Sequence, residues 1–195
     1  LFFHPISELR ESILFEDDMI SVENVILDHT LPCSGFIFKE KKSARKIKPK
    51  VIEQMNIPHD KLNSIKNGAD WINLKGEVVK NKDMTYPNSP PNTYAFCTDT
   101  RYTESIIPKI KGVDLLYHEA TFKNDMLERA FETGHSTTQQ ASYIANKACV
   151  KHLMIGHFSQ RYKKLDEMLL ETQKVFKNTI LAEAGMTIDF SNLTA

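Results

Sequence analysis

Cysteine is scarce in this sequence, and the few cysteines lie far apart. The chain of 195 residues has three, Cys33, Cys97 and Cys149, and no Cys-x-x-Cys pair. Disulfide scaffolds and thiolate zinc sites both need cysteines at short, recurring spacing, so the pattern argues against both classes. We therefore expect reduced thiols and a cytoplasmic protein.

Long hydrophobic runs are also missing. No stretch approaches the roughly 18 consecutive apolar residues that a membrane-spanning helix needs, so no membrane association is predicted. A signal peptide has basic residues before its apolar region, and the first five residues here, Leu-Phe-Phe-His-Pro, have none in that position. They also lack an initiating Met, and we expect the chain to be a piece of a longer protein.

The chain carries no net charge, because 25 basic residues balance 25 acidic ones, but the basic residues are unevenly placed. Residues 39–50 include seven basic residues and one acidic residue, a local excess of six positive charges. The basic residues are Lys39, Lys41, Lys42, Arg45, Lys46, Lys48 and Lys50. One interpretation is a solvated surface or linker; the other is an arm that contacts phosphates. Residues 51–68 are predicted to form short helical turns broken by Pro58, and the Pro- and Asn-rich residues 81–92 are predicted to be irregular. We therefore interpret residues 39–92 as an excursion from the core.

With 41% hydrophobic and 26% charged residues, the chain can bury one sizeable core. Extended runs are predicted at residues 12–15, 19–27, 36–38, 94–97, 114–117, 152–156, 180–184 and 186–190. Helices are predicted near residues 103–111, 137–149 and 164–176. The helix at 137–149 has the clearest pattern: a capping box over residues 136–139, followed by apolar residues at helical spacing, Ala141, Ile144, Ala145 and Ala148. These elements indicate a sheet-based fold.

Several of the extended runs end in ionisable side chains. The run at 94–97 leads to Asp99, that at 114–117 leads to His118-Glu119, and that at 152–156 leads to His157. An isolated Asp in this position more often caps the next turn. Because ligands bind at the carboxyl edge of such strands, the convergence of several polar groups there favours a site.

The candidate set comprises His29, Asp99, Glu119, His135 and His157. Imidazole and carboxylate without thiolate is the ligand chemistry of catalytic zinc or manganese. No pair has the His-x-x-x-His spacing of a helical site, and a hydrogen-bonded structural histidine is the alternative for each imidazole taken singly. His118 and Glu119 alternate along a strand, so only one of them can face the site.

Several motifs resemble, in order and spacing, those of ribonuclease Z, the tRNA 3′-end endonucleases of the metallo-β-lactamase superfamily. They are Asp28-His29 with Gly35-Phe36, Cys97-Thr98-Asp99-Thr100, His118-Glu119-Ala120-Thr121-Phe122, Gly134-His135-Ser136-Thr137 and Gly156-His157-Phe158-Ser159-Gln160-Arg161-Tyr162. The resemblance spans nearly the whole chain and implies an α/β fold, the αββα metallo-β-lactamase sandwich. The His-x-His-x-Asp-His motif of that family is absent here, so we expect the chain to be the carboxyl-terminal part, with that motif upstream of Leu1.

The resemblance also implies roles for individual residues. His29 would bind the first of two zinc ions per complete site, Asp99 would bridge both, and His157 would bind the second. Glu119 and His135 would form a proton shuttle. Residues expected at the scissile phosphate are Arg161, Thr100 and Ser136.

The activity implied is removal of 3′ trailers from precursor tRNA by attack of metal hydroxide on a phosphodiester, with residues 39–92 including a tRNA-binding arm. The family resemblance further implies a homodimer. The chain alone is expected to be inactive. Residues 57–61, Ile-Pro-His-Asp-Lys, differ from the Gly-Pro-rich arm tip of many related enzymes. A phosphodiesterase acting on small esters and a non-catalytic RNA-binding piece are the two alternatives.

Overall fold

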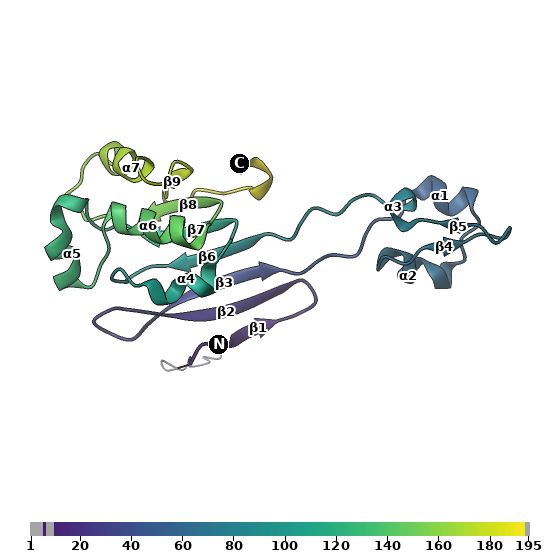
Figure 1. The fold of residues 1–195 in the computed structure, drawn as a ribbon, viewed down its shortest axis with the longest axis horizontal. Coiled ribbons are helices and arrows are strands. Elements are labelled where there is room, and N and C mark those ends of the chain that lie inside the picture. Colours follow the sequence, from purple (N-terminus) through teal and green to yellow (C-terminus); the bar gives the residue numbers. More distant parts are fainter. Residues whose placement is uncertain (1–5, 7–9, 194–195) are drawn as a thin grey trace. The chain divides into compact units, whose positions relative to one another are not determined.

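The computed structural model describes Ile6 and residues 10–193, and the chain divides into two compact units (Figure 1). One unit holds the described residues up to Glu40 and from Asn92 onward, and the other holds residues 41–91. The opening residues 1–5 lie outside the described part. None of the helices in the described part is long and apolar enough to cross a membrane.

The larger unit is built on a seven-stranded sheet of order β1-β2-β3-β6-β7-β8-β9. Neighbouring strands from β1 to β6 are antiparallel, and those from β6 to β9 are parallel. The strands are β1 (Ile13–Glu16), β2 (Ile20–Leu27), β3 (Cys33–Glu40), β6 (Thr93–Cys97), β7 (Leu115–Glu119), β8 (His152–Gly156) and β9 (Thr179–Leu181). All the predicted extended runs up to residue 184 fall on these strands, with ends that differ by a few residues.

Helices cover one face of this sheet. The helices of this unit are α4 (Ile107–Ile110), α5 (Leu127–Thr133), α6 (Thr138–Ala148) and α7 (Asp166–Gln173), and its short 3₁₀ turns are η2 (Glu104–Ile106), η3 (Asn124–Met126) and η4 (Phe190–Asn192). The turn η4 lies at the other face of the sheet, where Phe190 lines a hollow with Phe96 and Tyr117. The main core lies between the sheet and helices α4 and α6, where Ile37, Leu116, Leu153 and Ile144 are fully buried. Each fully buried aliphatic side chain of this kind stabilises the fold by about 1.5–3 kcal/mol.

Helix α6 confirms the predicted helix at 137–149, with one correction at its start. Thr137, rather than Ser136, is the N-cap: its hydroxyl accepts a hydrogen bond from the Gln140 amide, and the Gln140 side chain accepts one from the Thr137 amide. The Ser136 hydroxyl instead donates to the main-chain oxygen of Thr100. The predicted apolar face is fully buried at Ala141, Ile144, Ala145 and Ala148.

The second face of the sheet is aromatic, and it explains an incorrect strand prediction. Phe96 and Tyr117 stack there with ring centroids 4.6 Å apart. Together with Met186, Ile188 and Phe190 they line a hollow of about 330 Å³. Residues 186–190 therefore alternate because every second side chain faces the sheet, but they form no strand and pair with no ladder.

The unit of residues 41–91 is small. It contains α1 (Pro49–Gln54), η1 (His59–Lys61), α2 (Leu62–Lys66), the two-stranded sheet β4 (Trp71–Ile72) and β5 (Val78–Val79), and α3 (Asn81–Met84). Ile47, Ile57, Ile65 and Met84 form its core. The helical turns before and after Pro58 were predicted. The small sheet was not, and α3 shows that residues 81–92 are not irregular throughout.

Candidate active site

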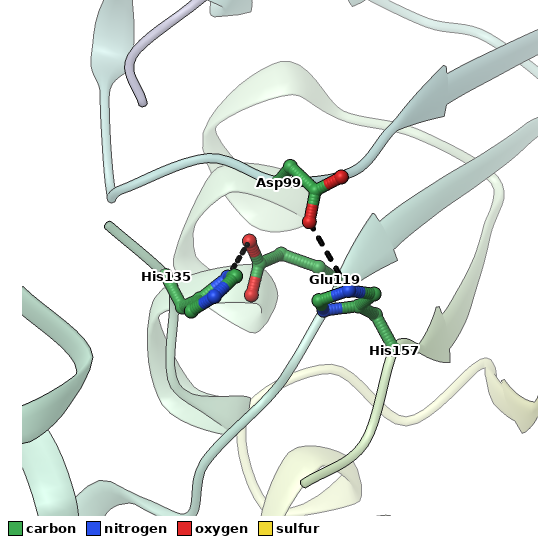
Figure 2. Close-up of side chains that lie close together, drawn as sticks. All are labelled: Asp99, Glu119, His135 and His157. Carbon is green, nitrogen blue, oxygen red and sulfur yellow. Dashed lines mark hydrogen bonds and ion pairs between the residues drawn. The ribbon is translucent and has the colours of Figure 1, made fainter. Parts of the chain in front are cut away.

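Three neighbouring parallel strands bring the predicted polar residues to one edge of the sheet. Glu119 is the last residue of β7, His157 directly follows β8, and Asp99 lies just beyond the end of β6. Glu119 is aligned with Gly156 across the ladder, so these strands end at the same level. Figure 2 shows Asp99, Glu119, His135 and His157 gathered at this edge.

Asp99 and His157 are in direct contact. The Nε2 atom of His157 lies 3.1 Å from an Asp99 carboxylate oxygen, and both side chains are 40% exposed. Both residues also have positive φ angles, 55° and 59°. This left-handed conformation is uncommon outside glycine but is tolerated best by Asn, Asp and His. The backbone thus turns sharply at both positions and aims two metal-ligand types at one point.

Glu119 is fully buried and has a partner at every hydrogen-bonding position. One oxygen accepts from the Thr100 amide at 2.6 Å and from His135 Nδ1 at 2.9 Å. The other accepts from the Thr121 hydroxyl at 2.6 Å and from the Ser136 amide at 3.1 Å. Burial alone would raise the pKa of Glu119, but the hydrogen bonds from His135, Thr121 and Ser136 hold it below its usual value.

His135 is the imidazole partner of this carboxylate. It follows Gly134, whose left-handed φ of 82° ends helix α5. The hydrogen bond to Glu119 raises the pKa of His135 above its usual value, although burial opposes the shift. The two directions agree: the hydrogen bond favours the ionised form of the carboxylate and the protonated form of the imidazole, which is the pairing that a general acid needs.

His29 lies beside this pair. Its Nδ1 is 2.8 Å from the main-chain oxygen of Gly134 and donates to it, so Nε2 is the ring nitrogen that could bind a metal ion. Its ring centroid is 5.3 Å from that of His135, which in turn is 5.1 Å from that of His157. The structure thus places three imidazoles in a row.

Thr121 is a site residue that the sequence analysis did not single out. Its hydroxyl donates to Glu119 and lies 2.9 Å from His157 Nδ1, which donates to it in turn. This bond fixes the tautomer of His157 and leaves Nε2 for a ligand. The only signal available in the sequence was its position two residues after Glu119.

The expected phosphate-binding residues differ in their surroundings. Thr100 and Ser136 are fully buried, and their hydroxyls donate to main-chain oxygens. Their demonstrated contact with the site is through their amides, which both bind Glu119. Arg161 is exposed, and its guanidinium lies 5.2 Å from the ring centroid of Phe122. The phosphate roles of all three remain predictions.

The donor set suits a metal ion. One ligand atom from each of Asp99, Glu119, His135 and His157 lies within 4.8 Å of the others. Nitrogen and carboxylate donors without thiolate match catalytic zinc. Because both oxygens of Glu119 are already bonded twice, the freer donors are Asp99, His157 and the neighbouring His29 Nε2. His118, as predicted, faces away: it is fully buried and its Nδ1 lies 2.8 Å from the main-chain oxygen of Glu119.

Comparison with solved structures identifies the fold. The metallo-β-lactamase fold protein YhfI from Bacillus subtilis superposes with a TM-score of 0.58 at 16% identity, covering 93% of this chain and 53% of that one. The short form of human tRNase Z gives a TM-score of 0.54 at 23% identity, covering 92% and 47%. The larger unit and its site therefore define an α/β protein of the metallo-β-lactamase-like fold.

Sequence comparison narrows this class. Ribonuclease Z of Bacteroides thetaiotaomicron is 41% identical over 194 residues, which are 100% of this chain and 61% of the relative. Ribonuclease Z of Parabacteroides distasonis is 44% identical over 186 residues, 95% of this chain and 61% of the relative. The chain is a homologue of ribonuclease Z, as the sequence motifs indicated, and it spans about 61% of the length of these curated relatives. No protein-family model matches it.

Proposed function

We propose that this chain forms part of a zinc-dependent endoribonuclease that removes 3′ trailers from precursor tRNA. The observation that carries the proposal is the Glu119–His135 pair, which lies beside the contacting ligands Asp99 and His157. Homology to ribonuclease Z supports the substrate class.

The metal site would be shared between this chain and another part of the protein. His29 would hold one zinc ion, Asp99 would bridge two, and His157 would hold the second. The remaining ligands would come from an upstream His-x-His-x-Asp-His segment. When bound, such ions stabilise negative charge that develops on a phosphodiester and lower the pKa of water.

The proton that the leaving group needs would come from His135. Its Nδ1 is held by Glu119, so Nε2 is the atom that donates to the departing ribose oxygen and leaves a 3′-hydroxyl on the tRNA. Glu119 stabilises the imidazolium before transfer, because its charge is buried 2.9 Å away. A positioned general acid of this kind contributes about 10²–10⁴-fold in rate.

Arg161 would supply positive charge to the scissile phosphate. It is exposed and lies over Phe122, whose ring centroid is 6.4 Å from that of His135. Thr100 and Ser136 would act through their amides, which hold Glu119 in place for the transfer.

The unit of residues 41–91 would be the tRNA-binding arm. It has a hollow of about 570 Å³ in which five basic side chains face one acidic side chain, Asp70. The basic residues are Lys42, Arg45, Lys66, Lys80 and Lys82. Only Lys42 and Arg45 come from the basic run at residues 39–50. Lysine and arginine neutralise backbone phosphates without reading sequence, as recognition of many tRNAs requires. A homodimer is also proposed, from the resemblance alone, and a cytoplasmic location is proposed from the scarce and widely spaced cysteines.

The deciding experiment is cleavage of a precursor tRNA by the full-length protein, with a His135→Ala variant beside it. We expect the wild type to release the trailer and leave a 3′-hydroxyl. The variant should cut about 10²–10⁴-fold more slowly at unchanged zinc content. Equal rates would refute the assigned role of His135. A wild type that hydrolyses only a small chromogenic phosphodiester would refute the tRNA substrate.

A further inference from the structure

We propose that the exposed ring of Phe131, held against Arg101, is a stacking platform for an unpaired nucleobase next to the bond that is cut. This inference rests on the RNA substrate proposed above. It concerns a surface beside the Glu119–His135 pair that takes no part in the metal site or the proton transfer.

The ring is exposed although its backbone is fixed. Phe131 is 69% exposed near the end of helix α5. Its main-chain oxygen accepts hydrogen bonds from the Gly134 amide at 3.3 Å and from Arg101 Nε at 2.9 Å. The Arg101 guanidinium carbon lies 5.5 Å from the ring centroid. The aromatic side chain is therefore presented to solvent on a support with little freedom.

Arg101 is committed to this support. Its amide donates to the Asp28 main-chain oxygen at 2.7 Å, and its guanidinium bonds both Phe131 and the Asp28 carboxylate. Its side chain is only 21% exposed. The fixed cation makes a favourable cation–π contact with the ring and leaves the exposed part of Phe131 for a further planar group.

Both members of the platform are tied to the catalytic pair. Arg101 follows Thr100, whose amide binds Glu119 at 2.6 Å. Phe131 lies in the last turn of α5, and His135 directly follows the end of that helix, with its amide donating to the Ala130 oxygen at 2.8 Å. A nucleotide that places its sugar oxygen at His135 would therefore bring a neighbouring base within reach of the ring.

A nucleobase suits this surface better than an aliphatic protein side chain does. Aromatic rings bind every base through its π-face, without sequence preference, and an adjacent arginine adds cation–π attraction and charge complementary to the RNA backbone. Leu127, one helical turn before Phe131, is also exposed, at 46%, but it has no ring on which a base could stack. It is the matched control for an apolar surface that a protein segment would cover.

The test measures the half-saturating concentration of precursor tRNA in single-turnover cleavage by the full-length protein. Variants are Phe131→Ala, Phe131→Leu, Phe131→Trp and Leu127→Ala. We expect the Ala and Leu variants at 131 to need about 5- to 100-fold more substrate, Trp to match the wild type, and Leu127→Ala to change little. Substrates that lack one base at the cleavage site complete the test: at one position, loss of the base should weaken wild-type binding but not further weaken the Phe131→Ala variant.

The outcomes separate this inference from the proposed function. Wild-type behaviour of Phe131→Leu, or equal losses from Leu127→Ala and Phe131→Ala, would show that a protein surface covers this face and would overturn the stacking role. The stacking role would also be overturned if every abasic substrate raised the half-saturating concentration by the same factor in the wild type and in Phe131→Ala. A wild type that fails to cleave precursor tRNA would overturn both proposals together.

Discussion

The Thr121 hydroxyl and the His157 imidazole lie 2.9 Å apart, and the same hydroxyl donates to Glu119 at 2.6 Å. One small side chain thus joins the proposed metal ligand to the proposed proton-transfer pair. Thr121 is buried, so solvent competes little for either bond. A change at Thr121 should therefore affect metal binding and proton transfer together.

Replacing Thr121 by Val tests this link, because Val keeps the shape and removes the contacts of the hydroxyl with Glu119 and with the His157 imidazole and main-chain oxygen. Outer-shell partners of this kind are worth about 10–100-fold in metal affinity or activity, and we expect losses in that range for zinc affinity and for precursor cleavage. Competition with a chromogenic chelator measures the first, and single-turnover kinetics measures the second. Thr121→Ser keeps the hydroxyl and should recover most of both. Unchanged zinc affinity in the Val variant would remove His157 orientation from the roles of Thr121.

A side chain at Gly134 is expected to disturb the site, because its Cβ would collide with His29 and because the backbone is left-handed there. A Cβ built there would lie 2.5 Å from His29 Nδ1, and φ is 82°. Gly112 is the matched control, since its φ is 72° but no atom lies within 4 Å of its Cβ position. Ala at either position should cost about 1 kcal/mol of folding free energy for the left-handed backbone. Only Gly134→Ala should also displace His29 and lower zinc content, measured by metal analysis of purified full-length protein. Equal zinc content in both variants would argue against His29 as a ligand.

Asp114, at the end of the sheet opposite the site, should make the stability of the fold depend on pH. Burial alone would raise the pKa of Asp114, but Lys151 and Thr93 hold it below its usual value. The Asp114 carboxylate lies 2.5 Å from Lys151 Nζ and accepts hydrogen bonds of 2.7 Å from the amide and the hydroxyl of Thr93. A carboxyl group whose pKa is lower in the folded than in the unfolded state stabilises the fold at any pH above the unfolded-state pKa. This stabilisation is lost as the pH falls through the folded-state pKa. Asp114→Asn should therefore cost about 1.5–3 kcal/mol at neutral pH.

Urea unfolding of the wild type and the Asp114→Asn variant checks this prediction. The difference in free energy of unfolding should be constant above about pH 5 and shrink below about pH 4. Asp125→Asn, at an exposed carboxylate, should change stability little at either pH. A difference that grows as the pH falls would contradict the assigned direction.

The basic hollow of residues 41–91 predicts a salt-dependent effect. Replacing Lys66, Lys80 and Lys82 by Ala should weaken precursor tRNA binding and lower the slope of log affinity against log salt by about one for each phosphate that is no longer neutralised. The control replaces three exposed lysines of the larger unit, Lys111, Lys174 and Lys177. Filter binding between low and high salt measures both slopes. An equal change in the two variants would show that the hollow has no special role.

The sequence predicted the positions of residues that depend on local structure, such as the end of a strand or the cap of a helix. Asp99, Glu119 and His157 could be predicted to converge because parallel strands end at a common edge, and α6 could be predicted because its cap and apolar face are local. Thr121 could not, since its role depends on a histidine 36 residues away. Residues 186–190 were misread because alternation arises equally from pairing in a ladder and from lying across an apolar face.

The four hydrogen bonds to Glu119 have a consequence for how the proposed reaction proceeds. Two donors are main-chain amides and the other two are held by their own neighbours, so the carboxylate cannot rotate without breaking several bonds together. Its negative charge is in place before any substrate arrives. When His135 gives up its proton in the proposed reaction, little of the protein around Glu119 has to reorganise.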